Sequence, residues 1–202
     1  MTNDQVTHDV AITTHVVTSC TNRRLSDRRF STTMSMTTCE YLLLDVDGVL
    51  TDGKLYFSGE GYEMKAFHTL DGHGIKMLRR SGVDVGIITG RNSSIVAKRA
   101  ADLGIKLLIQ GREDKFAAMQ ELLDGHSVEL NEIAFMGDDY PDLTVMCKVG
   151  LALTVANAHH AVVELAHWQS TNKGGEGAVR DACDLIMKAQ GTFDAALQAY
   201  TR

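Results

Sequence analysis

The chain has 202 residues, of which 44% are hydrophobic and 23% charged, with a single proline and a formal net charge of −6 at pH 7. This length suits one domain with a sizeable core. The acidic balance argues against nucleic acid or an anionic membrane as the main partner, and no apolar run approaches the roughly 18 to 20 residues of a membrane-spanning helix. The four cysteines form no C-x-x-C pair, which argues against a zinc site.

The first 39 residues differ in composition from the rest of the chain. They are rich in Ser and Thr, carry several arginines, and lack both a sustained apolar period and the apolar core of a secretory signal. We expect residues 1–39 to be a flexible extension, or an overlong gene start with Met34 or Met36 as the initiator. One folded domain is expected over residues 40–202.

Beyond the extension, apolar runs alternate with amphipathic stretches. This alternation predicts an α/β fold: a doubly wound (Rossmann-like), mostly parallel sheet with helices on both faces. The expected strands cover residues 41–45, 83–88, 106–109, 132–136 and 150–155. The expected helices cover residues 72–81, 93–103, 113–124, 140–147, 158–166 and 177–190. Within residues 53–67, two short alternating runs around Ser-Gly-Glu-Gly predict a β-hairpin that projects as a flap.

The first expected strand ends in two carboxylates. Leu42–Leu44 lead directly into Asp45, and Asp47 and Gly48 follow. A buried parallel strand delivers such residues to the carboxyl edge of the sheet, where open α/β folds place their sites. Gly48 allows the backbone to turn sharply there.

Three further polar clusters follow later strands. Thr89-Gly90-Arg91 ends one apolar run, Lys115 lies near the start of the helix after another, and Gly137-Asp138-Asp139 follows a third. Any one of these clusters alone is also compatible with a turn or a helix cap. Because parallel strands end at the same edge of a sheet, the four clusters together favour a catalytic site.

The residue types in these clusters predict metal-dependent phosphoryl transfer. Several carboxylates around one point repel each other unless a divalent cation binds there, and oxygen ligands suit Mg²⁺. Lys115, Thr89 and backbone N–H groups can hold phosphoryl oxygens. Asp45 facing such a pocket can attack phosphorus and form an aspartyl-phosphate.

The four clusters resemble the motifs of the haloacid dehalogenase superfamily of phosphotransferases. The resemblance implies that Asp45 is the nucleophile and Asp47 the general acid and base, while Thr89 and Lys115 hold the phosphoryl group. The implied metal ligands are Asp45, Asp47 through its backbone carbonyl, and Asp138, with Asp139 and Asp142 supporting them.

Many members of the superfamily carry a cap domain over the site, and this sequence leaves no room for one. A hairpin, one helix and one strand use up the segment between Asp47 and Arg91, and one helix and one strand fill the segment between Thr89 and Lys115. A capless phosphatase has an open site. It therefore takes a large substrate or borrows a lid from another subunit.

Three segments are similar to one capless family, the 3-deoxy-D-manno-octulosonate 8-phosphate phosphatases: residues 67–75, 87–91 and 174–180. The resemblance implies a cytoplasmic homotetramer in lipopolysaccharide biosynthesis that releases phosphate from this eight-carbon sugar acid, with each flap helping to cover a neighbour's site. Arg91 and Arg99 are eight residues apart, about two helical turns, so both could face one side of a helix. The implied substrate-binding residues are Asp47, His68, Thr69, Leu70, Asp71, Gly72, Lys76, Arg91, Arg99 and Lys115.

Three other interpretations stay open. The motifs fit equally a phosphatase of a nine-carbon nonulosonate 9-phosphate, although residues 68–72 favour the eight-carbon sugar. A phospho-acceptor signalling domain uses similar residue types, but its acceptor aspartate lies on a middle strand, and here the expected middle strand ends in Thr89. An inactive scaffold is disfavoured because every catalytic position holds the expected residue.

Overall fold

The computed structural model describes residues 36–201, so most of the predicted extension over residues 1–39 lies outside the described residues. Cys39 is already part of the folded domain. Its side chain is buried, and its carbonyl oxygen accepts a hydrogen bond of 2.8 Å from Nε2 of Gln190. Among the described residues, no helix is long and apolar enough to cross a membrane.

Six parallel strands form the central sheet in the order β5-β4-β1-β6-β7-β8. The strands are β1 (Tyr41–Leu44), β4 (Asp84–Thr89), β5 (Leu107–Gln110), β6 (Ile133–Met136), β7 (Leu151–Thr154) and β8 (Trp168–Gln169). The strand β1 lies between β4 and β6, and the chain order reverses direction there. In open α/β sheets, that switch point is where binding sites form.

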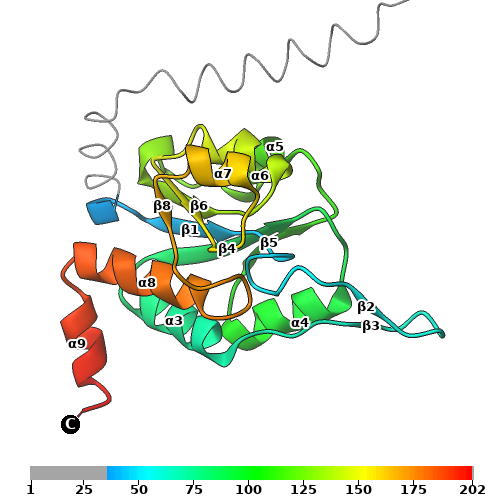
Figure 1. Ribbon diagram of the computed structural model, residues 1–202. Helices are drawn as coiled ribbons and strands as arrows, with labels where there is room; N and C mark the ends of the chain where they lie inside the picture. Colours follow the sequence, from blue (N-terminus) through cyan, green and yellow to red (C-terminus); the bar gives the residue numbers. More distant parts are fainter. Residues whose placement is uncertain (1–35, 202) are drawn as a thin grey trace, which may run out of the picture.

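Helices cover both faces of the sheet, as predicted (Figure 1). They are α3 (Thr69–Arg80), α4 (Ser94–Leu103), α5 (Lys115–Leu122), α6 (Tyr140–Met146), α7 (His160–Leu165), α8 (Ala178–Ala189) and α9 (Phe193–Gln198), with a 3₁₀ turn at Leu130–Glu132. The side chains of β1 alternate between two cores: Leu42 and Leu44 pack with α3, α4 and α8, and Leu43 packs with α5, α6 and α7. This two-sided burial explains why the strands read as continuous apolar runs.

Some boundaries differ from the sequence prediction. The helix α3 begins at Thr69, three residues before the predicted start, because Nδ1 of the His68 side chain accepts a hydrogen bond from the Leu70 N–H and caps the helix. The strand β8 and the helix α9 were not predicted. The strand has only two residues, and α9 has no buried residue to produce an apolar period.

The predicted hairpin is present and projects away from the sheet (Figure 1). It consists of β2 (Tyr56–Phe57) and β3 (Glu63–Met64), which pair antiparallel. Its apolar side chains are exposed; they include Leu55, Phe57, Tyr62 and Met64. In the described part of the chain, only α4 and β5 lie between β4 and α5, so no cap domain interrupts the fold there.

Candidate active site

The ends of β1, β4 and β6 bring the predicted catalytic residues to one edge of the sheet. Leu44 is level with Ile87 of β4 and with Met136 of β6 in the parallel registers. The N–H of Asp45 donates to the Met136 carbonyl oxygen at 3.0 Å, which continues the pairing by one residue. Asp45 and Thr89 are both buried at this edge. The prediction that these strand ends meet is therefore confirmed.

Lys115, the first residue of α5, lies between two carboxylates. Its Nζ is 2.8 Å from Oδ1 of Asp45 and 2.6 Å from Oδ1 of Asp142, and all three side chains are buried. Burial lowers the pKa of Lys115, but the charges of Asp45 and Asp142 outweigh that effect and raise it to about 12. Lys115 is therefore a fixed positive charge beside Asp45.

Asp45, Asp138 and Asp142 form a cluster in which carboxylate oxygens lie within 4.8 Å of one another. Asp142 already uses both of its oxygens, since Oδ1 faces Lys115 and Oδ2 accepts from the N–H groups of Asp138 and Asp139. In contrast, Oδ1 of Asp138 is buried and has no hydrogen-bond partner within the described part of the chain. Asp45 and Asp138 are thus the acids with capacity for another ligand.

Electrostatics at this cluster favour a cation. Burial first, and then the charge of Asp142, raises the pKa of Asp45 to about 7. Burial first, and then the charge of Asp45, raises the pKa of Asp138 to about 7. Two carboxyls that resist ionisation, next to an unpartnered oxygen, are what a hard divalent cation stabilises. The donor set fits Mg²⁺.

Glycine is required at two positions because the carboxylates approach the backbone closely. A Cβ at Gly48, where φ is +100°, would stand 2.1 Å from Oδ2 of Asp138. A Cβ at Gly137 would stand 2.3 Å from Cγ of Asp142. The buried hydroxyl of Thr154 donates to the Gly137 carbonyl oxygen at 2.7 Å and holds that turn in place.

The side chain of Asp47 faces the hairpin. It forms an ion pair with Lys65, and its Oδ2 lies 4.0 Å from Nε of Arg91. Glu63 contacts the same two cations. Sequence reasoning did not identify Glu63 or Lys65 as site residues. The only available signal was their alternation within the predicted hairpin, which places both on the face opposite Met64.

The predicted sugar-binding segment lies at the start of α3. Asp71 is 1% exposed, and its Oδ1 accepts from the Arg180 N–H at 2.8 Å, which ties α3 to the first turn of α8. Gly72 lies directly under Arg99, because a Cβ there would stand 2.3 Å from the guanidinium. Arg99 also donates to the His68 carbonyl oxygen at 3.3 Å. The other members of the predicted set, Thr69, Leu70 and Lys76, are exposed.

One geometric expectation was wrong. Arg91 and Arg99 do not share a helix, because α4 begins at Ser94, after Arg91. Arg91 belongs to the loop after β4 and lies over the ring of Phe57, whereas Arg99 lies over the ring of Phe67. The two arginines therefore face the hairpin segment from different elements.

The glycine-rich segment before α8 lies against the loop that follows Asp47. The Gly175 N–H donates to the Val49 carbonyl oxygen at 2.9 Å, and the Gly174 N–H donates to Oδ1 of Asn157 at 2.9 Å. A Cβ at Gly174 would stand 1.7 Å from the Gly48 carbonyl oxygen. This contact between two backbones joins α8 to the active-site edge.

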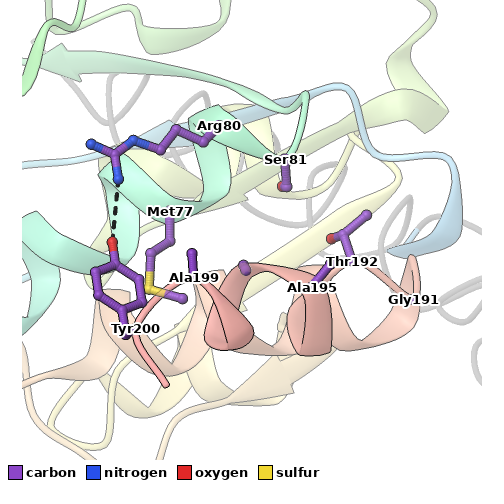
Figure 2. Close-up of a pocket in the computed structure, with 9 residues that line it drawn as sticks. Met77, Arg80, Ser81, Gly191, Thr192, Ala195, Ala199 and Tyr200 are labelled. Carbon is purple, nitrogen blue, oxygen red and sulfur yellow. Dashed lines mark hydrogen bonds between the residues drawn. The ribbon is translucent and has the colours of Figure 1, made fainter. Parts of the chain in front are cut away.

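A groove of about 430 Å³ lies away from this edge, between the C-terminal end of α3 and α9 (Figure 2). It is lined mainly by apolar and small side chains, among them Met77 and Ala195, and Arg80 donates to the Tyr200 hydroxyl at 3.2 Å beside it. Because α3 begins at the active-site edge and runs away from it, this groove is not part of the acidic site.

Comparisons with known proteins show the family of this chain. Residues 105–182 match the haloacid dehalogenase-like hydrolase family. The 3-deoxy-D-manno-octulosonate 8-phosphate phosphatase of Yersinia pestis is 46% identical over 155 residues, which cover 77% of this chain and 83% of that protein. The Escherichia coli K12 phosphatase of the same name is 45% identical, over 77% of this chain and 82% of that protein.

Solved structures give the same result. The Moraxella catarrhalis 3-deoxy-D-manno-octulosonate 8-phosphate phosphatase, in complex with magnesium, phosphate and KDO, is 37% identical, with a TM-score of 0.82 over 88% of this chain and 99% of that one. The cobalt-bound phosphatase of Haemophilus influenzae is 36% identical, with a TM-score of 0.79 over 83% of this chain and 99% of that one. The chain therefore belongs to the 3-deoxy-D-manno-octulosonate 8-phosphate phosphatase family of haloacid dehalogenase-like hydrolases.

Proposed function

We propose that the protein is a Mg²⁺-dependent phosphatase that hydrolyses 3-deoxy-D-manno-octulosonate 8-phosphate to the free sugar acid and phosphate. The observation that carries the proposal is the buried arrangement of Lys115 between Asp45 and Asp142, with the unpartnered Oδ1 of Asp138 in the same cluster. The identity of 45 to 46% with phosphatases of this name supports the choice of substrate.

The metal is assigned to Asp45 and Asp138 through their carboxylates and to Asp47 through its backbone carbonyl. Mg²⁺ bound there supplies positive charge that offsets the repulsion between a carboxylate nucleophile and an anionic phosphate ester. Asp142 is better described as a support, because both of its oxygens already accept hydrogen bonds from Lys115 and from backbone N–H groups.

In the first half-reaction, a carboxylate oxygen of Asp45 attacks phosphorus. The bond between phosphorus and the C8 oxygen of the sugar breaks, and the protonated carboxyl of Asp47 gives its proton to the leaving oxygen. Lys115, which lies 2.8 Å from Oδ1 of Asp45, offsets negative charge on the transferring group. The hydroxyl of Thr89 is assigned to donate a hydrogen bond to a phosphoryl oxygen.

In the second half-reaction, water attacks the phosphorus of the aspartyl-phosphate. Asp47, now a carboxylate, takes a proton from that water, and the bond between phosphorus and the Asp45 oxygen breaks. Phosphate leaves, Asp45 is again a carboxylate, and Asp47 is again protonated. The cycle consumes one water and needs no other reactant.

The sugar acid is assigned to the open side of this cluster, next to the start of α3 and the two arginines that face the hairpin. Arginine suits both the carboxylate and the phosphate of the substrate. The assigned residues are Asp47, His68, Thr69, Leu70, Asp71, Gly72, Lys76, Arg91, Arg99 and Lys115. Since Asp71 is buried and holds the Arg180 N–H, its part in binding is to shape the segment.

The proposal includes a homotetramer in the cytoplasm, acting in lipopolysaccharide biosynthesis. The hairpin supports assembly, because it exposes apolar side chains such as Phe57, Tyr62 and Met64 at its surface, and exposed apolar patches of this kind mark contact sites between proteins. A hairpin from a second copy would also cover a site over which the described residues place no cap domain.

The test is phosphate release from 3-deoxy-D-manno-octulosonate 8-phosphate with Mg²⁺ and with EDTA, beside a nonulosonate 9-phosphate and simple sugar phosphates. We expect Mg²⁺-dependent turnover with a strong preference for the eight-carbon acid. Preference for the nine-carbon acid would support the proposed mechanism but overturn the proposed substrate. Turnover that Asp45→Asn leaves unchanged would reject the mechanism.

A further inference from the structure

The hairpin carries a lysine whose charged side chain points into the protein. The side chain of Lys65 is 2% exposed, whereas the neighbouring residue Met64 is 65% exposed. A hairpin at a protein surface normally exposes its charged side chains to water and buries its apolar ones. Removing an ammonium group from water is costly unless it pairs with an anion. The residues that pair with Lys65 therefore indicate its role.

Those partners link the hairpin to the active site. Nζ of Lys65 forms an ion pair with Oδ1 of Asp47 and lies 3.5 Å from Oε1 of Glu63. Arg91 faces the same two acids, at 4.0 Å from Asp47 and 3.9 Å from Glu63. Two cations alternate with two anions. The hydroxyl of Ser93, which precedes α4, donates to Oε2 of Glu63 at 2.7 Å and fixes the Glu63 side of this network.

Within this network, Lys65 holds Asp47 more firmly than Arg91 does. The Arg91 side chain is 45% exposed and lies beyond hydrogen-bond distance from Asp47, so water screens its charge. Lys65 is sheltered from water and in direct contact with Oδ1. The Asp47 side chain is 20% exposed, and its Oδ2 has no comparably close cation among the ion pairs of the described residues. That oxygen is therefore free to face substrate or water.

We propose that Lys65 is a positioning residue for the reaction: by anchoring Oδ1 of Asp47, it turns Oδ2 toward the leaving group and the attacking water. The inference rests on the acid and base role of Asp47 in the proposed function. Proton transfer requires the carboxyl to lie within hydrogen-bond reach of the reacting oxygen, and a freely rotating carboxyl meets that condition only part of the time. Because Lys65 belongs to the hairpin, the position of the hairpin and the orientation of the Asp47 carboxyl are coupled.

The inference predicts that the effect of losing Lys65 depends on the leaving group. An alkoxide or a phenolate of high basicity needs a proton as it leaves, whereas 4-nitrophenolate leaves without one. The ratio kcat/KM reports the steps up to release of the leaving group, so it isolates the proton donation by Asp47. A residue that only stabilised the fold would affect all substrates alike.

The experiment compares Lys65→Met with the wild-type enzyme on 4-nitrophenyl phosphate, phenyl phosphate and 3-deoxy-D-manno-octulosonate 8-phosphate, each with saturating Mg²⁺. We expect kcat/KM to fall about 10- to 100-fold for phenyl phosphate and the sugar phosphate, and less than about threefold for 4-nitrophenyl phosphate. Lys54→Met is the matched control, because Lys54 precedes the same hairpin with a side chain that is 72% exposed. It should behave as wild type on all three substrates.

Lys65→Arg restores a cation beside Asp47 and should recover most of the loss on phenyl phosphate. If Lys65→Met does not fold, Lys65→Gln keeps a shorter, uncharged donor and supports the same comparison. Equal loss on all substrates, or no loss on any, would overturn the inference. Because phenyl phosphates carry no sugar, a wild-type enzyme that hydrolyses them but not the 8-phosphate would reject the proposed substrate and leave the test of Lys65 intact.

Discussion

The metal-free enzyme should be destabilised by its own active-site acids, and Asp138→Asn should relieve this effect. Burial first, and then the charge of Asp45, raises the pKa of Asp138 from 3.8 to about 7. A carboxyl whose pKa is raised on folding favours the folded state fully below its unfolded pKa. That contribution is lost as pH rises through the folded pKa. In EDTA, wild-type stability should therefore fall between pH 5 and pH 8.

The size of the effect follows from the pKa shift. For one fully buried carboxyl, a pKa moved from 3.8 to about 7 lowers the free energy of unfolding by about 2 to 3 kcal/mol between pH 5 and pH 8. Asp138 is only partly buried and shares its charge repulsion with Asp45, so we expect about 1 to 2 kcal/mol. For a chain of this length, that corresponds to roughly 2 to 8 °C in Tm.

The assay is thermal unfolding of wild type and Asp138→Asn at pH 5 and pH 8, in EDTA and in Mg²⁺. At pH 8 in EDTA the variant should melt above wild type, and at pH 5 the difference between the two should be smaller. Mg²⁺ should raise the Tm of wild type and not that of the variant. Asp124→Asn, which removes an exposed acid, is the charge-matched control. A variant no more stable than wild type at pH 8 in EDTA would refute the reasoning.

Three further predictions concern catalysis and packing. Asp45→Asn should reduce turnover by at least about a thousandfold while circular dichroism shows an intact fold, because the amide is not a nucleophile; residual turnover near the wild-type level would count against it. Lys115→Met should lower the free energy of unfolding by about 2 to 4 kcal/mol in chemical denaturation, since it leaves Asp45 and Asp142 buried without their cation, and an unchanged midpoint would contradict this. Gly174→Ala should lower both Tm and activity, because its Cβ would stand 1.7 Å from a carbonyl oxygen of the catalytic loop, whereas Gly59→Ala, which meets nothing within 4 Å, should change neither.

The fold and the catalytic cluster were predictable because their signals are local. Leu42–Leu44 form an apolar run that ends in Asp45, and the same pattern recurs at Thr89 and before Asp138. Parallel strands align their carboxyl ends, so identifying the strands was enough to predict that these residues meet. Lys115 was included because it begins the helix after β5, and its contact with Asp45 at 2.8 Å agrees with that placement.

Other parts of the site had no local signal. The ion pairs of Lys65 with Asp47 and Glu63 depend on where the hairpin folds back against the domain. An alternating run of residues predicts that one face points inward, but not which residues that face contacts. The helix predicted over residues 93–103 already left Arg91 outside it, but the rings that Arg91 and Arg99 cover depend on where the hairpin segment folds.

Local patterns in the sequence were enough to predict the order of most strands and helices, the positions of the candidate catalytic acids at the strand ends and the family, because periodicity and motif spacing are properties of short segments. The packed fold was needed to show which acids keep a free oxygen, which cation pairs with Asp47, and how closely the Gly174 backbone lies against Gly48. Those outcomes depend on side chains and backbones from distant segments competing for the same hydrogen bonds and the same space.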